Sequence, residues 1–434
     1  MLGWEYPPHI SGGLGTACEG IARGLVENGH EVLFVLPKLF GDEDGRGAWL
    51  LSASDVPLPP DARIPAGAAR EITERLQLAY VDSPLRPYQT AGDYSTMLRK
   101  IRRGVPRPTT HDRHAQASAR SFDGGYGPSL ASEVERFAHV TAELARRENF
   151  DVIHAHDWMT FPAGLLARRV SGRPLVCHVH ASEYDRGGSR PDPGIVGIEQ
   201  RTLASADAVV AVSEYTKSHL LSAYRLDADR VRVVHNAHSR RTARAVRSIS
   251  ETGRPSVLFL GRFTRQKGPE TFLEAARIVA TRHPNVEFVL AGGGTLEAEL
   301  RQMAVRLGLS DRVRFAGFLD REEVEHAYAR ADLYVMPSAS EPFGIASLEA
   351  LSCDTPVIVS DRAGVTEAIP SAPTFKAGDP QDLAREIEKI LFQPDHAKRL
   401  VAQGRAELGQ LCWRTAGERL GEIYFELTFE GALA

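Results

Sequence analysis

The stretch LYVMPSASEPFGIASLEA, residues 333–350, joins an apolar run to a helical segment through a loop that contains Pro342 and Gly344. Its first part, 333–336, is an unbroken apolar run, which is typical of a strand buried on both faces of a parallel sheet. We expect a helix to begin near Phe343, directly after the loop. A strand, a loop and a helix in this order predict one unit of an α/β fold.

The same unit recurs along the chain on both sides of this stretch. Further apolar runs lie at 31–36, 151–155, 175–180, 208–212, 231–234, 256–260, 286–291, 313–316 and 356–359. Amphipathic segments, for example 269–283, 296–307 and 382–392, alternate with them. Repeated strand–helix alternation predicts a doubly wound α/β architecture with parallel sheets.

A length of 434 residues and one break in the alternation predict two domains. The break at 238–254 is rich in Arg, Ser and Thr and poor in apolar residues, which indicates a linker. We therefore expect Rossmann-like domains at 1–237 and 255–410 that face a cleft, and a final segment at 411–434. The first domain carries a long insertion at about 40–127, rich in Pro, Gly and Arg.

Composition narrows the class of protein. The 52 Lys and Arg residues and 56 Asp and Glu residues give a net charge of 52 − 56 = −4, which favours no nucleic-acid partner. A local patch could still mediate peripheral membrane contact. The four cysteines are widely spaced without metal-ligand spacing, and no apolar run is long enough to span a bilayer. We expect reduced thiols in a cytoplasmic protein, and the cysteine spacing gives no indication of a bound metal.

Two carboxylates lie on the loop and helix of the opening stretch. The start of a helix exposes free N–H groups and the positive end of its dipole, which suits a diphosphate. Glu341 lies before this helix start, and Glu349 lies within the helix. Their spacing fits a sugar hydroxyl pair and a ribose diol better than a metal ion. The simpler alternative is a helix cap followed by an incidental glutamate.

Two cations follow the run at 256–260. Arg262 and Lys267 lie in the segment GRFTRQKG, five residues apart, and would face the expected cleft. Cations at that place neutralise a departing diphosphate as its charge develops. A P-loop is excluded, because the chain has no Gly-x4-Gly-Lys-Ser/Thr pattern.

Two glycine-rich loops have a less specific meaning. The segments 291–294 and 11–15 each allow close approach of a ligand or of packing neighbours. Only Met1 and Leu2 precede the loop that leads to 11–15, so the chain is expected to start a few residues late within its first strand.

Four histidines follow two neighbouring strands. His154 and His156 share one side of their strand, as do His178 and His180 of the next. Zinc is conceivable here, but the usual ligand spacings are missing. A wall of hydrogen-bonding groups for sugar hydroxyls fits better, with a buried structural role as the alternative for His154 and His178.

With these motifs, the chain resembles the retaining GT-B glycosyltransferases of the GT4 and glycogen/starch synthase-like group along nearly its whole length. The resemblance lies in the Gly-Gly-Leu-Gly loop, His-Ala-His-Asp-Trp, His180, Val234-His235-Asn236, Arg262, Lys267 and the Glu-x7-Glu pair Glu341/Glu349. It implies that a nucleotide sugar binds mostly to the second domain. It also implies that the last helix crosses back to the first domain.

The resemblance implies roles for individual residues. The catalytic set is Glu341, His180, Arg262 and Lys267. The donor-binding set is Gly12, Gly13, Arg262, Lys267, Phe318, Leu319, Phe343, Gly344, Ile345 and Glu349. The acceptor-side set is Glu5, His156 and Asp157. Glu341 would position the donor sugar rather than attack it, because the group is described without a dedicated carboxylate nucleophile.

The implied reaction moves a hexose, with glucose as the first expectation, from a UDP- or ADP-sugar to the hydroxyl of a carbohydrate or lipid-linked acceptor, with no cofactor. Ser11 stands where starch and bacterial glycogen synthases carry lysine, in Lys-x-Gly-Gly, which weakens a full polymerase assignment. The alternatives are a GT-B nucleotide-sugar epimerase, a phosphorylase, or a catalytically idle carbohydrate-binding relative.

Overall fold

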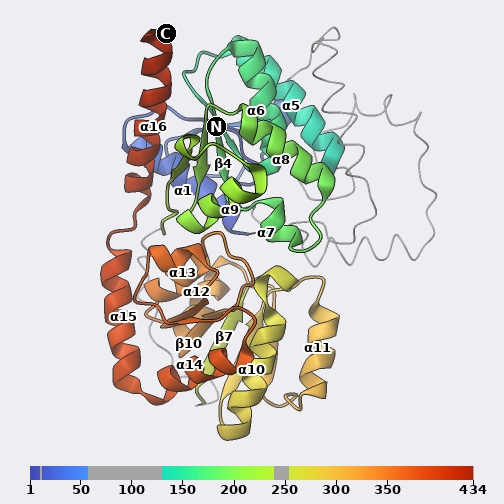
Figure 1. The fold of residues 1–434 in the computed structure, drawn as a ribbon, viewed down its shortest axis with the longest axis vertical. Helices are drawn as coiled ribbons and strands as arrows, with labels where there is room; N and C mark the ends of the chain where they lie inside the picture. The colour runs from blue at the N-terminus through green and yellow to red at the C-terminus, as the bar shows by residue number, and fades with distance from the viewer. Residues whose placement is uncertain (10–11, 57–129, 239–253, 434) are drawn as a thin grey trace, which may run out of the picture. The chain divides into compact units, whose positions relative to one another are not determined.

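The computed structural model describes residues 1–9, 12–56, 130–238 and 254–433. These residues form two compact units (Figure 1). Unit 1 comprises 1–212, 217–234 and 413–434, and unit 2 comprises 213–216 and 235–412. Most of the expected insertion, from 57 onward, and nearly all of the expected linker lie outside the described residues.

The strands of unit 1 pair in parallel around the N-terminal residues of the chain. Leu2 bridges Val35 on one side and Ala155 on the other, through backbone hydrogen bonds to both neighbours. The spatial order is therefore β2, β1, Leu2, β3, β4, β5 and β6. The strands are β1 (Leu33–Leu36), β2 (Trp49–Ser52), β3 (Ile153–His156), β4 (Leu175–Val179), β5 (Ala208–Ala211) and β6 (Val231–Val233). Chain order reverses between Leu2 and β3, so their carboxyl ends form a switch point where such sheets bind ligands.

Helices follow most strands in this half of the chain. They are α1 (Gly13–Glu27), α5 (Leu130–Arg147), α6 (Asp157–Ser171), α7 (Glu183–Gly187), α8 (Pro193–Ser205) and α9 (Glu214–Tyr224). The last helix, α16 (Trp413–Leu433), packs against α1. Glycines make this contact close: a Cβ atom on Gly24 would lie 2.0 Å from the carbonyl oxygen of Trp413. Any larger residue at this position would force the two helices apart.

Unit 2 contains one parallel sheet in the order β12-β11-β10-β7-β8-β9. Its strands are β7 (Ser256–Leu260), β8 (Glu287–Ala291), β9 (Val313–Gly317), β10 (Leu333–Met336), β11 (Val357–Ser360) and β12 (Thr374–Phe375). This is the Rossmann order, with the switch point between β7 and β10. The loops that follow these two strands are therefore the place where a ligand is expected.

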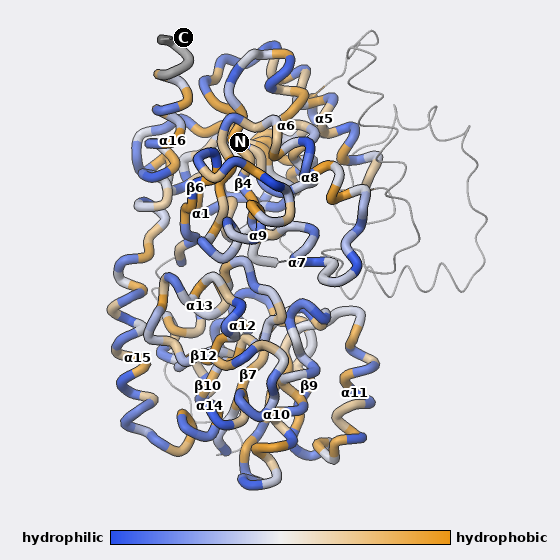
Figure 2. Tube along the Cα trace, in the orientation of Figure 1, coloured by the Kyte–Doolittle hydropathy of each residue, from blue (hydrophilic) through white to orange (hydrophobic). Residues whose placement is uncertain are grey.

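Among the described residues of unit 2, six α-helices accompany this sheet. They are α10 (Pro269–Arg282), α11 (Glu297–Arg306), α12 (Arg321–Arg330), α13 (Ile345–Ser352), α14 (Pro380–Phe392) and α15 (Pro394–Leu408). Phe259, Phe272 and Phe288 are buried in the core beneath them. Hydrophobic and hydrophilic residues alternate along α11 and α15, as amphipathic helices require (Figure 2). No helix among the described residues is both long enough and apolar enough to cross a membrane.

The α/β class with parallel sheets is confirmed. Each of the ten apolar runs identified in the sequence overlaps a strand, whereas β2 and β12 were not predicted. Strand β2 begins with Trp49, which is 76% exposed, and β12 has two residues, so neither has the long buried run that reveals a strand. Helix α13 begins at Ile345, two residues later than expected, because Gly344 has a φ of 113° and serves as its N-cap.

Candidate functional site

The switch point of unit 2 brings together two of the predicted catalytic residues. Lys267 ends a short 3-10 turn (Arg265–Lys267) after β7, and Glu341 lies in the loop after β10. Lys267 Nζ donates to Glu341 Oε2 at 2.6 Å, and Ser338 Oγ donates to the same oxygen at 2.9 Å. Glu341 is 7% exposed, so its carboxylate is largely shielded from water, whereas the Lys267 side chain is half-buried.

Backbone contacts hold the two loops against each other. The N–H of Ala339 donates to the carbonyl of Gln266 at 2.8 Å, and Gln266 Nε2 returns a bond to the carbonyl of Ser340 at 3.2 Å. Gly268 permits this approach, because a Cβ atom there would lie 2.1 Å from the carbonyl oxygen of Pro337. The geometry of the Lys267–Glu341 pair is thus set by the protein before any ligand arrives.

The start of α13 lies directly beyond Glu341. Gly344 is left-handed at φ 113°, and the Phe343 carbonyl accepts from Val365 N–H at 2.8 Å. A helix start leaves its first N–H groups without partners inside the helix, which suits a phosphate. The Phe343 ring is buried beside the His235 ring, so this residue offers its backbone to a ligand.

The remaining donor-side residues of unit 2 lie on neighbouring elements. Glu349 is on α13, where Tyr328 Oη donates to its Oε2 at 3.4 Å. Phe318 and Leu319 follow β9, and the Phe318 ring is 70% exposed, which suits stacking on a base. Arg262 lies in the loop after β7, half-buried, between Gly261 and the buried Phe263.

The two glycine-rich loops have different surroundings. In the 291–294 loop, Cβ atoms on Gly292 and Gly294 would lie 2.0 Å from the Gly261 carbonyl oxygen and 2.6 Å from that of Phe263. These two glycines therefore allow the loops after β7 and β8 to pack together. A Cβ atom on Gly12 or Gly13 would meet no heavy atom within 4 Å, which leaves room for a ligand before α1.

The residues predicted for the acceptor side lie in unit 1 and are deeply buried. Glu5, His156 and Asp157 are 4%, 0% and 1% exposed. His156 Nδ1 pairs with His180 Nε2 at 2.9 Å, and Asp157 Oδ1 accepts from the His180 N–H at 2.7 Å. In this structure His156 and Asp157 both contact His180, so they support the position of that residue.

The four histidines form a cluster in the sheet of unit 1, in which His154, His156 and His178 are buried and His180 is half-buried. His154 Nε2 pairs with His178 Nδ1 at 3.1 Å, and His154 Nδ1 pairs with Tyr424 Oη of α16. Burial lowers the pKa of His180 to about 3 and those of His154, His156 and His178 well below their usual range. The cluster is therefore neutral at physiological pH.

Two sets of three potential ligand atoms lie within 4.8 Å of one another in this cluster: Cys18/His156/His180 and His154/His156/His178. The imidazole rings are nearly parallel, with interplanar angles of 17° for His178/His180 and 21° for His154/His156. Parallel rings direct their lone pairs side by side rather than toward one point. Hydrogen bonding between neutral rings fits this geometry better than shared coordination.

Acidification is expected to destabilise the protein through this cluster. Because burial keeps the folded-state pKa values below the unfolded value of 6.5, the unfolded chain binds more protons as the pH falls through 6.5. Each histidine then costs about 1.4 kcal/mol at pH 5.5. Asp157 and Glu199 act in the opposite direction, because burial raises their pKa values to about 6 and 7. Between pH 7.5 and 5.5, these two carboxyls offset about half of the stability lost through the four histidines.

Urea titrations at pH 7.5 and 5.5 test this expectation. The free energy of unfolding of the wild type should fall by at least about 2–3 kcal/mol between the two values, because the buried Met1 amino group, whose pKa burial lowers to about 5, adds to the loss from the histidines. In His178→Phe, which keeps a ring but removes one titrating group, that fall should shrink by about 1.4 kcal/mol. An equal fall in both proteins would contradict the prediction that His178 stays neutral in the folded protein at pH 5.5.

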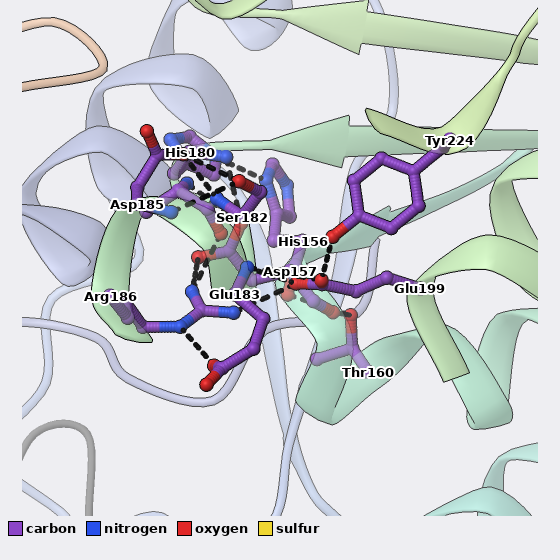
Figure 3. Close-up of polar contacts among 11 residues, drawn as sticks. His156, Asp157, Thr160, His180, Ser182, Glu183, Asp185, Arg186, Glu199 and Tyr224 are labelled. Atoms are coloured by element: carbon purple, nitrogen blue, oxygen red, sulfur yellow. Dashed lines mark hydrogen bonds and ion pairs between the residues drawn. The ribbon is translucent and has the colours of Figure 1, made fainter. Parts of the chain in front are cut away.

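A second buried network surrounds the segment after β4 (Figure 3). Arg186 donates to Glu199 Oε1 at 2.8 Å and to the Ala181 carbonyl at 2.6 Å, and lies 3.9 Å from Asp157 Oδ2. Tyr224 Oη donates to Glu199. No sequence motif points to Arg186, Glu199 or Tyr224, although Glu183 and Arg186 have the i,i+3 spacing of a helical ion pair.

Family models match both halves of the chain. The model "Glycosyl transferases group 1" matches residues 241–407, and the model "Glycosyltransferase Family 4" matches residues 108–239. Together they span the candidate site of unit 2 and most of the histidine and arginine networks of unit 1.

Curated relatives agree with these models. A D-inositol 3-phosphate glycosyltransferase of Thermobispora bispora is 30% identical over 302 residues, covering 64% of this chain and 71% of its own. A glycogen synthase of Mycobacterium tuberculosis is 24% identical over 432 residues, covering 98% and 93%.

Solved structures share the fold. A sucrose-phosphate synthase of Thermosynechococcus elongatus has a TM-score of 0.67 at 19% identity, covering 96% of this chain and 94% of its own. The Anabaena protein HepE, in complex with UDP and glucose, has a TM-score of 0.58 at 21% identity, covering 83% and 96%.

Proposed function

Because the chain belongs to the GT4-type glycosyltransferases and is a transferase enzyme with the GT-B fold, we propose that it moves glucose from a UDP- or ADP-sugar to an acceptor hydroxyl with retention of configuration. One observation carries the proposal: the Lys267–Glu341 pair lies at the switch point of unit 2, beside the start of α13. The cation and the N–H groups at this helix start suit the diphosphate of a nucleotide sugar, and the carboxylate suits the hydroxyls of its sugar.

The main chemical task of this site is to stabilise the nucleoside diphosphate as it leaves the sugar. The bond between the anomeric carbon and the phosphate oxygen breaks, and its electron pair stays with the diphosphate. Arg262, Lys267 and the N–H groups at the start of α13 stabilise the negative charge that develops. In this proposal the protein's own cations supply that stabilisation without a bound metal.

The sugar and the nucleoside bind to neighbouring side chains. Glu341 accepts hydrogen bonds from hydroxyls of the donor sugar, and Glu349, on α13, accepts hydrogen bonds from the two ribose hydroxyls. The exposed Phe318 ring stacks on the base. UDP and glucose in the Anabaena HepE complex support the choice of a glucose nucleotide.

Release of nucleoside diphosphate tests the proposal. UDP-glucose, ADP-glucose, UDP-GlcNAc and GDP-mannose are each incubated with the enzyme, alone and with maltooligosaccharide or D-inositol 3-phosphate. We expect release from a glucose donor that rises with one acceptor. A product that keeps the α-configuration by NMR would support retention.

Other outcomes separate the alternatives. Release that no added acceptor stimulates keeps the transferase and redirects the search to lipid-linked acceptors. Conversion of the sugar nucleotide without release indicates an epimerase, and a requirement for inorganic phosphate indicates a phosphorylase. No turnover in folded protein indicates an idle carbohydrate-binding relative and overturns the proposal.

A further inference from the structure

The segment after β4 is held by one arginine that has almost no contact with solvent. The side chain of Arg186 is 5% exposed and faces three carboxylates, on Asp157, Glu183 and Glu199. Arginine suits such a place, because its planar group donates in several directions at once and stays charged. Figure 3 shows this side chain surrounded by its partners.

Asp157 and Arg186 fix the position of the backbone at His180 and Ala181. Asp157 has a φ of 59°, and its Oδ1 accepts from the N–H groups of His180 at 2.7 Å and Ala181 at 3.3 Å. Arg186 lies against the other carboxylate oxygen of Asp157 and also donates to the Ala181 carbonyl at 2.6 Å. Asp157 and Arg186 therefore hold the N–H and carbonyl groups of one short segment.

Glu199 ties this segment to α8. Glu199 accepts from Arg186 at 2.8 Å and from the backbone N–H of Glu183 at 3.0 Å, and Tyr224 donates to it as well. Glu199 is 1% exposed. A buried carboxylate with this many donors fixes the position of the arginine firmly.

The three carboxylates around Arg186 depend on its positive charge. Three carboxylates share this one guanidinium, and Asp157 and Glu199 are almost fully buried. Removing the guanidinium leaves carboxylates without a counter-charge in a low dielectric, so they must take up protons or move apart. Either response would release the Ala181 carbonyl and shift the backbone at His180.

We propose that Arg186 is a positioning residue for the transfer reaction, which fixes the backbone of His180 and Ala181 through Asp157 and Glu199. The inference rests on the proposed function, because the family resemblance places His180 in the catalytic set. Arg186 itself touches no substrate in this proposal. Its loss should slow turnover without weakening nucleotide binding, since the diphosphate-binding groups belong to unit 2.

The chain offers a matched control at the opposite end of the same strand. Arg168 makes a two-bonded ion pair with Asp207 at 2.8 Å for both bonds, and Asp207 accepts from the N–H of Leu175, the first residue of β4. Arg186 acts near the carboxyl end of β4, and Arg168 acts at its amino end. Replacing either arginine removes an ion pair at one end of β4, but only the replacement of Arg186 should affect His180.

The experiment compares Arg186→Met, Arg186→Lys and Arg168→Met in the full chain. Thermal unfolding, the Kd for UDP, and kcat and KM for the preferred donor are measured for each. We expect Arg186→Met to lower kcat at least tenfold with a Kd for UDP within twofold of the wild type. Arg186→Lys should recover part of kcat, and Arg168→Met should keep kcat within twofold despite a lower melting temperature.

Histidine ring NMR gives a readout that does not need turnover. In protein labelled with ¹⁵N-histidine, the His180 signals are assigned from their loss in His180→Gln. Arg186→Met should shift them, and Arg168→Met should leave them in place. Equal kcat in the two methionine variants, or His180 signals that do not move in Arg186→Met, would overturn the inference. A wild type that releases no nucleoside diphosphate would instead overturn the proposed function, and the NMR comparison would still decide the positioning role.

Discussion

Replacing Lys267 with alanine is expected to lower kcat by about a hundredfold or more, because the variant lacks a cation at the departing diphosphate. Loss of one preorganised donor to a developing anion costs about 10²–10³ in kcat in other enzymes. Binding of the intact donor should weaken less, since the extra charge on the diphosphate appears only as the sugar leaves.

The ion pair with Glu341 makes the effect specific to this position. Lys267 Nζ lies 2.6 Å from Glu341 Oε2, so the alanine variant also leaves that carboxylate without its cation. A shielded carboxylate without a counter-charge repels the negative charge that the reaction creates nearby. Both consequences act on the transition state, and both lower kcat.

Arg265 provides the control for this variant. It lies in the same short turn with the same charge, but its side chain is 76% exposed and lies within ion-pair distance of Glu270. Arg265→Ala should keep kcat within about threefold of the wild type, as surface charges contribute little. Steady-state release of nucleoside diphosphate from the preferred donor measures both variants. Equal loss in the two would show that Lys267 has no special place at the diphosphate.

The proximity of Lys267 and Glu341 was predictable, because each belongs to a short motif that follows a strand. Arg262 and Lys267 follow one apolar run, and Glu341 follows another. The carboxyl ends of parallel strands meet at one edge, so a strand order with β7 beside β10 brings these motifs together. The structure adds the Lys267–Glu341 hydrogen bond, which the sequence analysis did not predict.

The supporting networks of unit 1 could not be predicted in the same way. Arg186, Glu199 and Tyr224 come from three helices, and their meeting depends on how those helices pack. Glu199 lies in a segment whose sequence does not reveal that its carboxylate is buried. The pairing of His156 with His180 likewise depends on the register of β3 beside β4. Tertiary packing, rather than local propensity, determines these contacts.

The isosteric variant Glu341→Gln is expected to lower kcat by about tenfold to a hundredfold. The amide keeps an oxygen that can accept from Lys267, but it brings no negative charge and accepts sugar hydroxyls less strongly. Glu407→Gln is the matched control in the same unit, because Glu407 also accepts from a serine hydroxyl, that of Ser371 at 2.7 Å. Its kcat should stay within about twofold of the wild type.

Combining the two changes tests whether Lys267 and Glu341 act as one unit. Residues in direct contact give non-additive effects, and this pair is joined by a 2.6 Å bond. In Lys267→Ala/Glu341→Gln, the unpaired carboxylate left by the first change is no longer charged. The double variant should therefore be slower than wild type by clearly less than the product of the two single losses. A loss equal to that product would mean that the carboxylate and the cation act on separate parts of the donor.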